Sequence, residues 1–526
     1  MTPLSPALPR TAVGWLPYLW QKVLFASDTP TSSTTNVMSV LVLLILPALL
    51  LYPTLGFHLL EPDEGRYAQI PKEMLVNHEW VVPTLQGEAY LDKPPLMYWL
   101  IKLSYLTFGV SEEAARLVPA ICVHLTILAV YFLGRRSLGE RSAFWSALLL
   151  SVAPGYVGIA RLLLLDGLLT LCVTVSVLCG YEAVRTGKLK RNWWIASAIA
   201  SGLGFLTKGP ISEILLFPPL FVAAWLSGSM AKVGWKKVVL FAAIVISINI
   251  PWYIAIYLRE PMFLKHFFWD HNVMRFLQPF DHLQPVWYYT PILLLGLMPG
   301  TLLFVPFARR LFGNNTGSRP FSQAGGFWLL AGGWCVIFFS VSGSKLPTYI
   351  LPAYPFLCLA LGEFVAKSDW SLKRTPKVLV GAFAALLLGI FHVGMPWYAK
   401  TRSPFGQPEV VRQYVANDNT HVITYPRNCD SLAFYSNRAD FDRVRSKGVN
   451  EMIVAMHHRP ETVMLFTHRH SFEAFQDALP PSLEVVKRVS LKRPAHGLLG
   501  KLAGETPWGL ADIAVIRPVT VRAQSD

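Results

Sequence analysis

Three acidic residues stand together directly after the first long apolar run of the chain. Glu61, Asp63 and Glu64 are followed by Arg66 and Tyr67. A single acid here would only end an apolar helix at the water boundary, but three acids beside an arginine predict a partly dehydrated site. In such a site a carboxylate can act as a general base or bind a metal ion. Asp63 is the favoured residue, whereas Glu61 and Glu64 could still be ordinary boundary acids.

Lysines stand where two other apolar segments begin or end. Lys93 lies in YLDKPP, residues 90–95, after Tyr90 and Asp92 and before two prolines that suit a helix start. Its ammonium and the free N–H groups of that helix start could bind one anion together. Lys208, in LTKGP, lies at a similar junction. The alternative for both lysines is that they extend to lipid headgroups.

A third cluster contains histidine and arginine. His271 and Arg275 are four residues apart, so they share one face of a helix, with His266 beside them. A divalent metal ion could bridge His271 and an acid such as Asp92 or Asp63, although the chain has no HExxH pattern. We favour a phosphate contact for Arg275, because guanidinium groups bind phosphate in a bidentate manner.

Two further stretches complete the candidates. Asp166 follows RLLLL at the outer start of an apolar run, where an ionisable side chain is costly and tends to be functional. Arg161 is a candidate partner for it. Lys345 and Tyr349, in GSKLPTYILP, are four residues apart and share one face at a helix entrance.

The composition indicates that these residues are positioned by membrane helices. The chain has 526 residues, of which 53% are hydrophobic and 15% charged, and its mean hydropathy is +0.40. About eleven apolar runs approach the length that crosses roughly 30 Å of hydrocarbon. The first is too long and too late for a cleaved signal peptide. The runs are 37–57, 114–134, 142–160, 163–183, 192–207, 210–227, 236–257, 286–308, 325–342, 346–366 and 377–397.

The net charge of +15 does not indicate a nucleic-acid partner, because the basic residues cluster in every second loop between the apolar runs. This pattern is typical of loops on the cytoplasmic side of a membrane. With the N-terminus in the cytoplasm, all five clusters fall inside and the candidate site residues fall outside. The clusters are Arg135, Arg136 and Arg141; Arg185, Lys188, Lys190 and Arg191; Lys232, Lys236 and Lys237; Arg309, Arg310 and Arg319; and Lys367, Lys373, Arg374 and Lys377.

The predicted domain organisation follows from this topology. Residues 1–36 form a cytoplasmic segment, and residues 37–399 form a helical membrane domain with outer loops at 58–113 and 258–285. Residues 400–526 change to a mixed polar composition, with strand-like HVITY and ETVMLF and helix-like SFEAFQDAL. This predicts a small α/β domain outside the cytoplasm.

Part of the first outer loop has the pattern of an amphipathic helix. Tyr67, Ile70 and Met74 fall on one helical face, and Gln69 and Glu73 fall largely on the other. We therefore expect this helix to lie in the membrane interface.

The chain has no Walker A motif and no GxGxxG sequence that opens a strand–helix unit, so a cytosolic nucleotide is not expected as donor or fuel. An outward-facing site without a nucleotide requires a substrate that is already activated in the membrane. A polyprenyl-phosphate-linked sugar meets this requirement.

Four motifs in matched order carry a family resemblance: EPDEGRYA, YLDKPPLMYWL, LTKGP and KLPTYILP. The set resembles the bacterial ArnT-like aminoarabinose lipid A transferases, which are related to dolichyl-phosphate-mannose protein mannosyltransferases. The resemblance covers residues 37–400 and a similarly placed periplasmic tail. It implies a GT-C glycosyltransferase fold with about 11–13 transmembrane helices and an inner-membrane location. The active site and the C-terminal domain would then be periplasmic.

The resemblance also implies a reaction. The donor would be an undecaprenyl-phosphate-linked sugar, the acceptor lipid A or a related envelope glycolipid, and the anomeric carbon would be inverted. Asp63 resembles the catalytic carboxylate of the family, and Lys93 and Arg275 resemble its clamp on the donor phosphate.

The remaining site residues are assigned in the same way. Asp166, which resembles a second acidic residue near the cavity, is the other catalytic candidate beside Asp63. Asp92 and His271 match positions for a divalent ion (Zn, Mg or Mn). The further substrate-binding candidates are Arg66, Tyr90, Lys208, Lys345 and Tyr349.

Two other functions compete with this one. The same fold could glycosylate proteins from a polyprenyl-phosphate-mannose-type donor, and then a general base would be needed to activate a hydroxyl group. A transporter is disfavoured, because transporters place their charged residues near the middle of the membrane, whereas these motifs lie at one surface.

Overall fold

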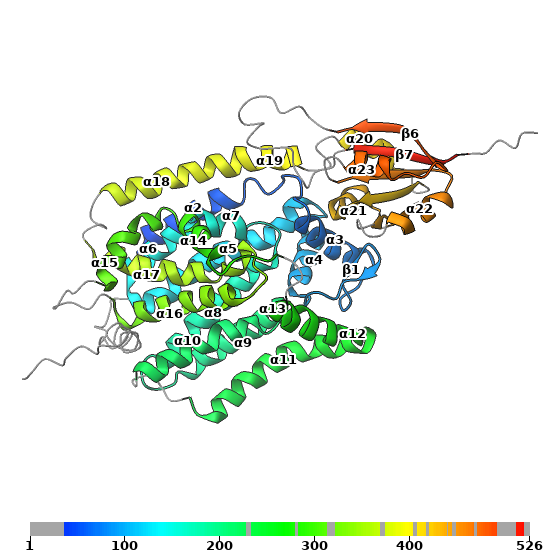
Figure 1. Cartoon of the computed structure of the whole chain (residues 1–526). Helices are drawn as coiled ribbons and strands as arrows, with labels where there is room; N and C mark the ends of the chain where they lie inside the picture. The colour runs from blue at the N-terminus through cyan, green and yellow to red at the C-terminus, as the bar shows by residue number, and fades with distance from the viewer. Residues whose placement is uncertain are drawn as a thin grey trace, which may run out of the picture. The chain divides into compact units, whose positions relative to one another are not determined.

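The computed structural model describes most of the chain, and it is mainly helical with one larger β-sheet (Figure 1). The predicted cytoplasmic segment 1–36 lies outside the described residues apart from Asn36. The described ranges are 36–227, 233–278, 282–312, 321–368, 374–402, 408–416, 420–438, 440–443, 449–467, 471–491 and 512–519.

The chain divides into two compact units. The helical unit comprises Met1–Pro53, Leu91–Met97 and Pro119–Leu388, and the mixed unit comprises Thr54–Tyr90, Tyr98–Val118 and Gly389–Asp526. The mixed unit therefore combines most of the first outer loop with the C-terminal part of the chain. The predicted domain boundaries follow the order of the sequence, whereas these units are defined by packing, so those boundaries stay a prediction.

The core of the helical unit is a bundle of apolar helices. Helix α8 packs against α9 and α10, α17 packs against α6 and α16, and α11 packs against α9. Nearly all of α8 is buried, which agrees with apolar residues on all sides of the helix. The helices are α2 (Val37–Leu51), α5 (Glu112–Leu138), α6 (Glu140–Ser151), α7 (Pro154–Ala160), α8 (Leu165–Val184), α9 (Arg191–Lys208), α10 (Ile211–Ser227), α11 (Trp235–Arg259), α14 (Tyr289–Gly296), α15 (Phe304–Phe312), α16 (Gln323–Val341), α17 (Ala353–Lys367) and α18 (Arg374–Gly389).

Five helices of the described residues are long and apolar enough to cross a membrane, or up to seven if each bent helix pair is one span. The predicted apolar runs coincide with helices, but the predicted count of about 11–13 spans is not reached. Helices α2, α10 and α17 have only 15, 17 and 15 residues, which is shorter than about 20 residues of full-thickness span. Two other runs are broken, by 59° between α6 and α7 and by 101° before Gly300.

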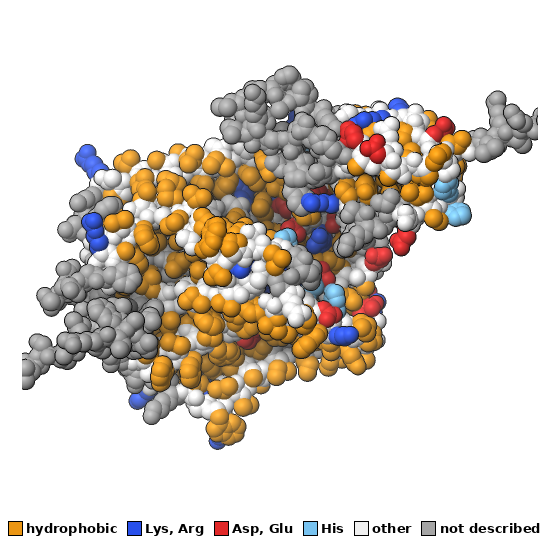
Figure 2. Space-filling view, viewed as in Figure 1, with side chains coloured by type: hydrophobic (Ala, Val, Ile, Leu, Met, Phe, Trp, Pro, Cys, Tyr) orange, Lys and Arg blue, Asp and Glu red, His pale blue; other side chains and the backbone are white. Residues whose placement is uncertain are grey.

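Hydrophobic side chains cover much of the outer surface of the helices (Figure 2). Helix α11 illustrates this, because only 28% of its most apolar window is buried. Ile246, Ile250 and Ile254 are all about half exposed on it. An apolar surface of this extent is expected where lipid, and not water, surrounds the helices.

The C-terminal part of the mixed unit contains a five-stranded sheet in the order β4-β3-β5-β7-β6. Strand β3 pairs in parallel with β4 and β5, and β7 pairs antiparallel with β5 and β6. The strands are β3 (His421–Tyr425), β4 (Asp442–Arg443), β5 (Thr462–Phe466), β6 (Leu483–Ser490) and β7 (Asp512–Pro518). The helices are α20 (Pro408–Val415), α21 (Asp430–Ser436), α22 (Val449–His457) and α23 (Ser471–Asp477). The predicted α/β character is therefore confirmed.

The amphipathic segment of the first outer loop forms helix α3 (Asp63–Val76), but its surroundings differ from the prediction. The polar side chains Gln69 and Glu73 are buried, at 3% and 7% exposure. Glu73 accepts hydrogen bonds from Gln69, from Thr84 and from the backbone of Gln86. These last two residues belong to the hairpin of β1 (Thr84–Leu85) and β2 (Glu88–Ala89) and its turn. The polar face of helix α3 therefore packs against the β1–β2 hairpin and is not exposed to water.

Candidate functional site

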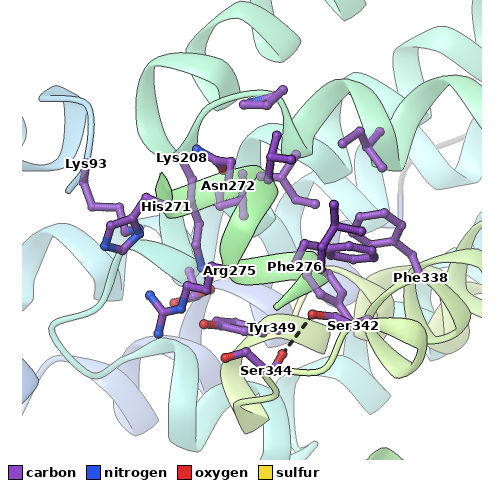
Figure 3. A pocket seen from close by; sticks show the side chains of 18 residues that line it. Lys93, Lys208, His271, Asn272, Arg275, Phe276, Phe338, Ser342, Ser344 and Tyr349 are labelled. Carbon is purple, nitrogen blue, oxygen red and sulfur yellow. Dashed lines mark hydrogen bonds and ion pairs between the residues drawn. The ribbon is translucent and has the colours of Figure 1, made fainter. Parts of the chain in front are cut away.

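The helical unit contains an open cavity of about 380 Å³ whose wall is charged in one part and apolar in another (Figure 3). The apolar part includes Phe276, Phe338 and Phe339. The charged and polar lining residues are Lys93, Asp166, Lys208, His271, Asn272, Arg275, Ser342, Ser344 and Tyr349. Segments far apart in the sequence therefore meet at one site, and six of the predicted site residues line it.

Three cationic side chains line this cavity: Lys93, Lys208 and Arg275. Nζ of Lys93 lies 3.4 Å from Nδ1 of His271. Burial and the repulsion by Lys208 and Arg275 lower the pKa of Lys93 to about 7, although Asp92 opposes the shift. Like charges in one partly dehydrated cavity repel each other, so an anion bound between them would lower their energy. The arrangement is suited to binding an anion.

The LTKGP motif explains where Lys208 lies. Lys208 is the last residue of α9, and Gly209 ends the helix with a φ of +79°, which glycine adopts without a steric penalty. A Cβ atom on Gly209 would also lie 2.7 Å from the ring of Phe267. The lysine is thereby held at the helix end, next to the segment that carries His271.

Lys208 pairs with the membrane acid of the predicted site. Its Nζ lies 2.6 Å from Oδ1 of Asp166, in the first turn of α8, and 4.8 Å from the centre of the Tyr349 ring. Arg161, the partner considered from the sequence, is buried and donates to the backbone oxygen of Leu50. The Lys208–Asp166 ion pair keeps both charges at the cavity wall.

A group of possible metal ligands adjoins the cavity. The ligand atoms of Asp92, His266 and His271 all lie within 4.8 Å of one another. Nε2 of His266 and of His271 lie 3.0 and 3.3 Å from Oδ1 of Asp92. Burial would raise the pKa of Asp92, but the hydrogen bonds with both histidines and the charge of Lys93 hold it well below its usual range.

A π-helix, Lys265–Met274, explains why both histidines take part. Residues five apart point in quite different directions on an α-helix, but the wider π-turn, with its i→i+5 hydrogen bonds, brings them to the same side. The ring centres of His266 and His271 are accordingly 5.5 Å apart. Arg275 begins the following short helix, α13 (Arg275–Leu277).

The mixed unit contains the acidic motif, which consists of Glu61, Asp63 and Glu64. Asp63 stands in the first turn of α3 with its side chain 48% exposed, and its Oδ1 lies 3.8 Å from Nη1 of Arg66. The Arg66 guanidinium also lies 5.9 Å from the centre of the Tyr90 ring and 3.7 Å, through Nε, from Oδ2 of Asp430. These interactions, which burial opposes, keep the pKa of Arg66 above its ordinary value. Asp63 is therefore an accessible carboxylate beside a fixed cation.

Glu64 is buried and Glu61 is partly buried, and both are bonded within the protein, so the interpretation of them as water-boundary acids is wrong. Glu64 forms a buried ion pair with Arg116 at 2.7 Å, and Arg116 also donates to backbone oxygens that include Leu55 and His58. Glu61 accepts a hydrogen bond of 2.6 Å from the backbone N–H of Ser431. Burial and the nearby Asp430 raise the pKa of Glu61 to about 8. Both residues hold the unit together.

Comparison with known proteins identifies relatives of this chain. A family model described as dolichyl-phosphate-mannose-protein mannosyltransferase matches residues 92–254. An undecaprenyl phosphate-alpha-4-amino-4-deoxy-L-arabinose arabinosyl transferase of Edwardsiella ictaluri is 33% identical over 68% of this chain, and the chain spans 65% of that relative. The protein of the same name from an Enterobacter species is 32% identical over 71% of this chain and 68% of its own length.

The chain belongs to this arabinosyl transferase family. A solved structure agrees with the assignment: ArnT from Cupriavidus metallidurans, bound to undecaprenyl phosphate, superposes with a TM-score of 0.69 at 20% identity, over 91% of this chain and 97% of that one. The predicted GT-C glycosyltransferase fold is thereby confirmed. The family and the apolar helices together make this a multi-pass membrane protein.

In this member of the arabinosyl transferase family, the site residues predicted from the motifs fall into two groups. Asp63, Arg66 and Tyr90 belong to the mixed unit, and the others belong to the helical unit. Lys345 does not line the cavity: its ammonium donates to the backbone oxygens of Gln284 and Ser342. Its assignment to the substrate site therefore stays a prediction.

Sequence reasoning did not assign roles to His266 or Asp430. His266 was seen beside His271, but an α-helical spacing gave no reason to count it as a ligand. Asp430 is more than 350 residues from Arg66 in the sequence, and no local pattern signals that pair.

Proposed function

We propose that this protein transfers a sugar from undecaprenyl phosphate to lipid A or a related envelope glycolipid. The observation that carries the proposal is the cavity that joins Lys93, Lys208 and Arg275 to a wall of aromatic and aliphatic side chains. A lipid phosphate has both a charged head and an apolar chain, and such a cavity suits both. Membership of the arabinosyl transferase family makes 4-amino-4-deoxy-L-arabinose the first choice of sugar.

The cations of the cavity would promote departure of the lipid phosphate. In the reaction the bond between the anomeric carbon and the phosphate oxygen breaks, and the electron pair stays on the phosphate. The negative charge on that oxygen grows toward the transition state. Lys93 and Arg275, with Lys208 behind them, are placed to stabilise that charge.

Asp63 is assigned as the catalytic carboxylate, supported by its exposure and its position beside Arg66. The acceptor oxygen attacks the anomeric carbon from the side opposite the phosphate, so the configuration inverts. A phosphate oxygen of lipid A needs no deprotonation, and Asp63 would then orient it. Asp166, paired with Lys208, would fix that lysine, and Tyr90 and Tyr349 would line the substrate.

The group of Asp92, His266 and His271 is assigned as a divalent-metal site. Two imidazoles and one carboxylate suit zinc better than magnesium, because magnesium prefers oxygen ligands. A bound ion would add positive charge beside an anion in the cavity, since His271 lines it. The residues present therefore fit such a group.

Replacing His266 and His271 together with alanine is expected to remove the metal. Purified wild-type protein, dialysed against metal-free buffer, should retain about one zinc ion per chain, because three protein ligands suffice for a tight site. The double variant should retain almost none by inductively coupled plasma mass spectrometry. His457→Ala, at the end of α22, is the matched control and should keep its zinc. Equal metal content in wild type and double variant would contradict the assignment.

The proposal includes an orientation in the membrane. The protein would lie in the bacterial inner membrane with its N-terminus in the cytoplasm, and with Asp63, Lys93 and the C-terminal sheet on the periplasmic side. The alternation of basic loops in the sequence supports this orientation.

A second candidate function rests on the family-model match at residues 92–254, whose description is a protein mannosyltransferase. The two candidate functions can be distinguished by mass spectrometry of lipid A and of envelope glycoproteins from cells with and without the gene. We expect deletion to remove a pentosamine from lipid A, and re-expression of the wild-type gene, but not of Asp63→Asn, to restore it. Unchanged lipid A together with lost protein glycans would favour the second candidate.

A further inference from the structure

We propose that the adjoining ends of helices α5, α8 and α9 bind the phosphate headgroup of an anionic phospholipid such as phosphatidylglycerol, with an acyl chain of that lipid along α5. None of the residues of this site lines the cation-lined cavity, so its ligand is separate from the sugar donor. Two of the basic loop clusters thereby gain a ligand of their own.

One buried carboxylate gathers three cations at these helix ends. Glu182, in the last turn of α8, has a side chain that is 5% exposed, and its Oε2 lies 2.6 Å from Nε of Arg185. Its Oε1 lies 2.7 Å from Nζ of Lys190 and 3.6 Å from Nη2 of Arg136. Arg185 also donates to the backbone oxygen of Arg136, which is 49 residues away in the sequence. Two basic clusters that are separate in the sequence therefore form one surface cluster.

The cations outnumber the acids in this surface cluster. A single carboxylate balances one of its three partners, and residues 183–193 contain no further acid. Glu140, the next acid after Arg136, is already bonded to the hydroxyl group of Tyr131. The side chains of Arg136 and Lys190 remain 43% and 38% exposed, so a ligand can reach both. Because packing holds these like charges together, an anion between them lowers their energy.

Helix α9 adds backbone donors to the surface cluster. It begins at Arg191, and the side chain of the preceding Lys190 makes no capping hydrogen bond. The first N–H groups of a helix have no partner within the helix, and together with the helix dipole they favour an anion. Arg136 is held close to this start, because its guanidinium lies 4.7 Å from the centre of the Trp193 ring, and Lys188 and Arg191 are exposed beside it. Side-chain cations and backbone donors together suit a phosphate group.

An apolar stripe on α5 leads to the same cations and favours a lipid over free phosphate. Ile121, Leu125 and Phe132 are 40%, 46% and 37% exposed. They are spaced by four and seven residues, and Arg136 follows Phe132 by four, so all of them share one face of the helix. The Arg135 guanidinium lies 5.1 Å from the centre of the Phe132 ring. Inorganic phosphate uses only the cations, whereas a phospholipid also covers the stripe.

Native mass spectrometry of the full-length protein in detergent tests the site. Titration with palmitoyl-oleoyl phosphatidylglycerol gives the Kd of the first bound lipid, and phosphatidylcholine with the same chains is the neutral comparison. Wild-type protein should bind phosphatidylglycerol at least about tenfold more tightly than phosphatidylcholine. Arg136→Met combined with Lys190→Met should weaken the binding of phosphatidylglycerol roughly 20- to 30-fold, because each basic side chain near a lipid headgroup contributes a factor of about five.

The matched control removes two cations elsewhere. Arg374 and Lys377 are exposed at the start of α18, and their joint replacement by methionine should leave the Kd within about twofold of the wild-type value. Lys93→Met, in the cavity, should also leave the Kd for phosphatidylglycerol unchanged. If the Tm shows that the Arg136 and Lys190 variant folds poorly, Lys188→Gln combined with Arg191→Gln replaces it.

Each alternative has its own signature. Equal losses of affinity in the two charge pairs, or equal binding of the two lipids by wild type, would mean general attraction and would overturn the site. Phe132→Ser should weaken lipid binding about fivefold, because an apolar contact is lost; an unchanged Kd, with inorganic phosphate displacing the lipid, would assign the cations to free phosphate instead.

Two further outcomes would also overturn the site. A dimer in the spectra that Phe132→Ser dissociates would assign the stripe to a second copy of the chain. Loss of phosphatidylglycerol binding in Lys93→Met, but not in the Arg136 and Lys190 variant, would place the lipid in the cavity. All these outcomes leave the proposed sugar transfer untouched, because that function is measured with the donor and not with phosphatidylglycerol.

Discussion

Asp63→Asn is expected to reduce kcat for sugar transfer by about a hundredfold or more, the size of effect seen when a catalytic acid or base is removed. Asparagine has nearly the same shape as aspartate, and the Asp63 side chain is 48% exposed, so the fold should survive. What it lacks is the negative charge that orients or deprotonates the acceptor. Initial rates with radiolabelled donor in detergent or nanodiscs would measure the effect.

Glu64→Gln, one residue further on, is the informative comparison. Glu64 is buried and paired with Arg116 at 2.7 Å, so removal of its charge leaves a buried arginine without its partner carboxylate, which costs stability. We expect a lower Tm for Glu64→Gln and a normal Tm for Asp63→Asn. The exposed Glu88 in β2, changed to glutamine, should alter neither property. Normal turnover by Asp63→Asn would remove Asp63 from the catalytic role.

The fold was predictable where local pattern and packing agree. HVITY is rich in β-branched residues, and it forms β3 between two neighbouring strands with its three central residues buried, as expected for such a composition. The membrane helices were located for the same reason, since each apolar run became helical. Their number was not predictable, because a run such as 142–160 looks continuous but breaks before Pro154, between α6 and α7. Proline lacks the N–H group that would continue the helix.

The candidate site was predictable only in part, because its geometry depends on contacts that a sequence does not encode locally. Lys93 and Arg275 stand out through charge beside apolar runs, and both line the cavity. Lys345 stands out equally, yet its ammonium bonds two backbone oxygens. The hydrogen bond of Glu61 and the buried ion pair of Glu64 depend on Ser431 and Arg116, which lie far away in the chain. Residue type suggested the chemistry, and tertiary packing decided which side chains are available for it.

The charges of the cavity suggest why the proposed phosphate site contains several cations. Lys93 is partly buried, and its pKa is lowered to about 7 mainly by burial and by Lys208. Without an anion these charges repel one another, so the binding energy of a lipid phosphate includes the relief of that repulsion. The same argument predicts that a released product phosphate competes with the donor for the cavity.

Lys93→Met and Arg275→Met should therefore each weaken the binding of undecaprenyl phosphate roughly 10- to 100-fold, as expected for the loss of a hydrogen bond to a charged group. Methionine preserves the length and apolar character of the side chain, so the cavity should keep its shape. Competition with a fluorescent undecaprenyl phosphate analogue in nanodiscs would give the Kd of each variant. The double variant should bind more weakly than either single one.

Lys236→Met, at the exposed start of α11, is the matched control for loss of one positive charge and should leave the Kd unchanged. The comparison decides between two explanations of the basic residues. If all three variants lose affinity equally, general attraction of the lipid by positive charge explains binding. If only Lys93→Met and Arg275→Met lose affinity, the phosphate is held in the cavity. If neither does, both residues are excluded from the clamp and the donor must bind elsewhere.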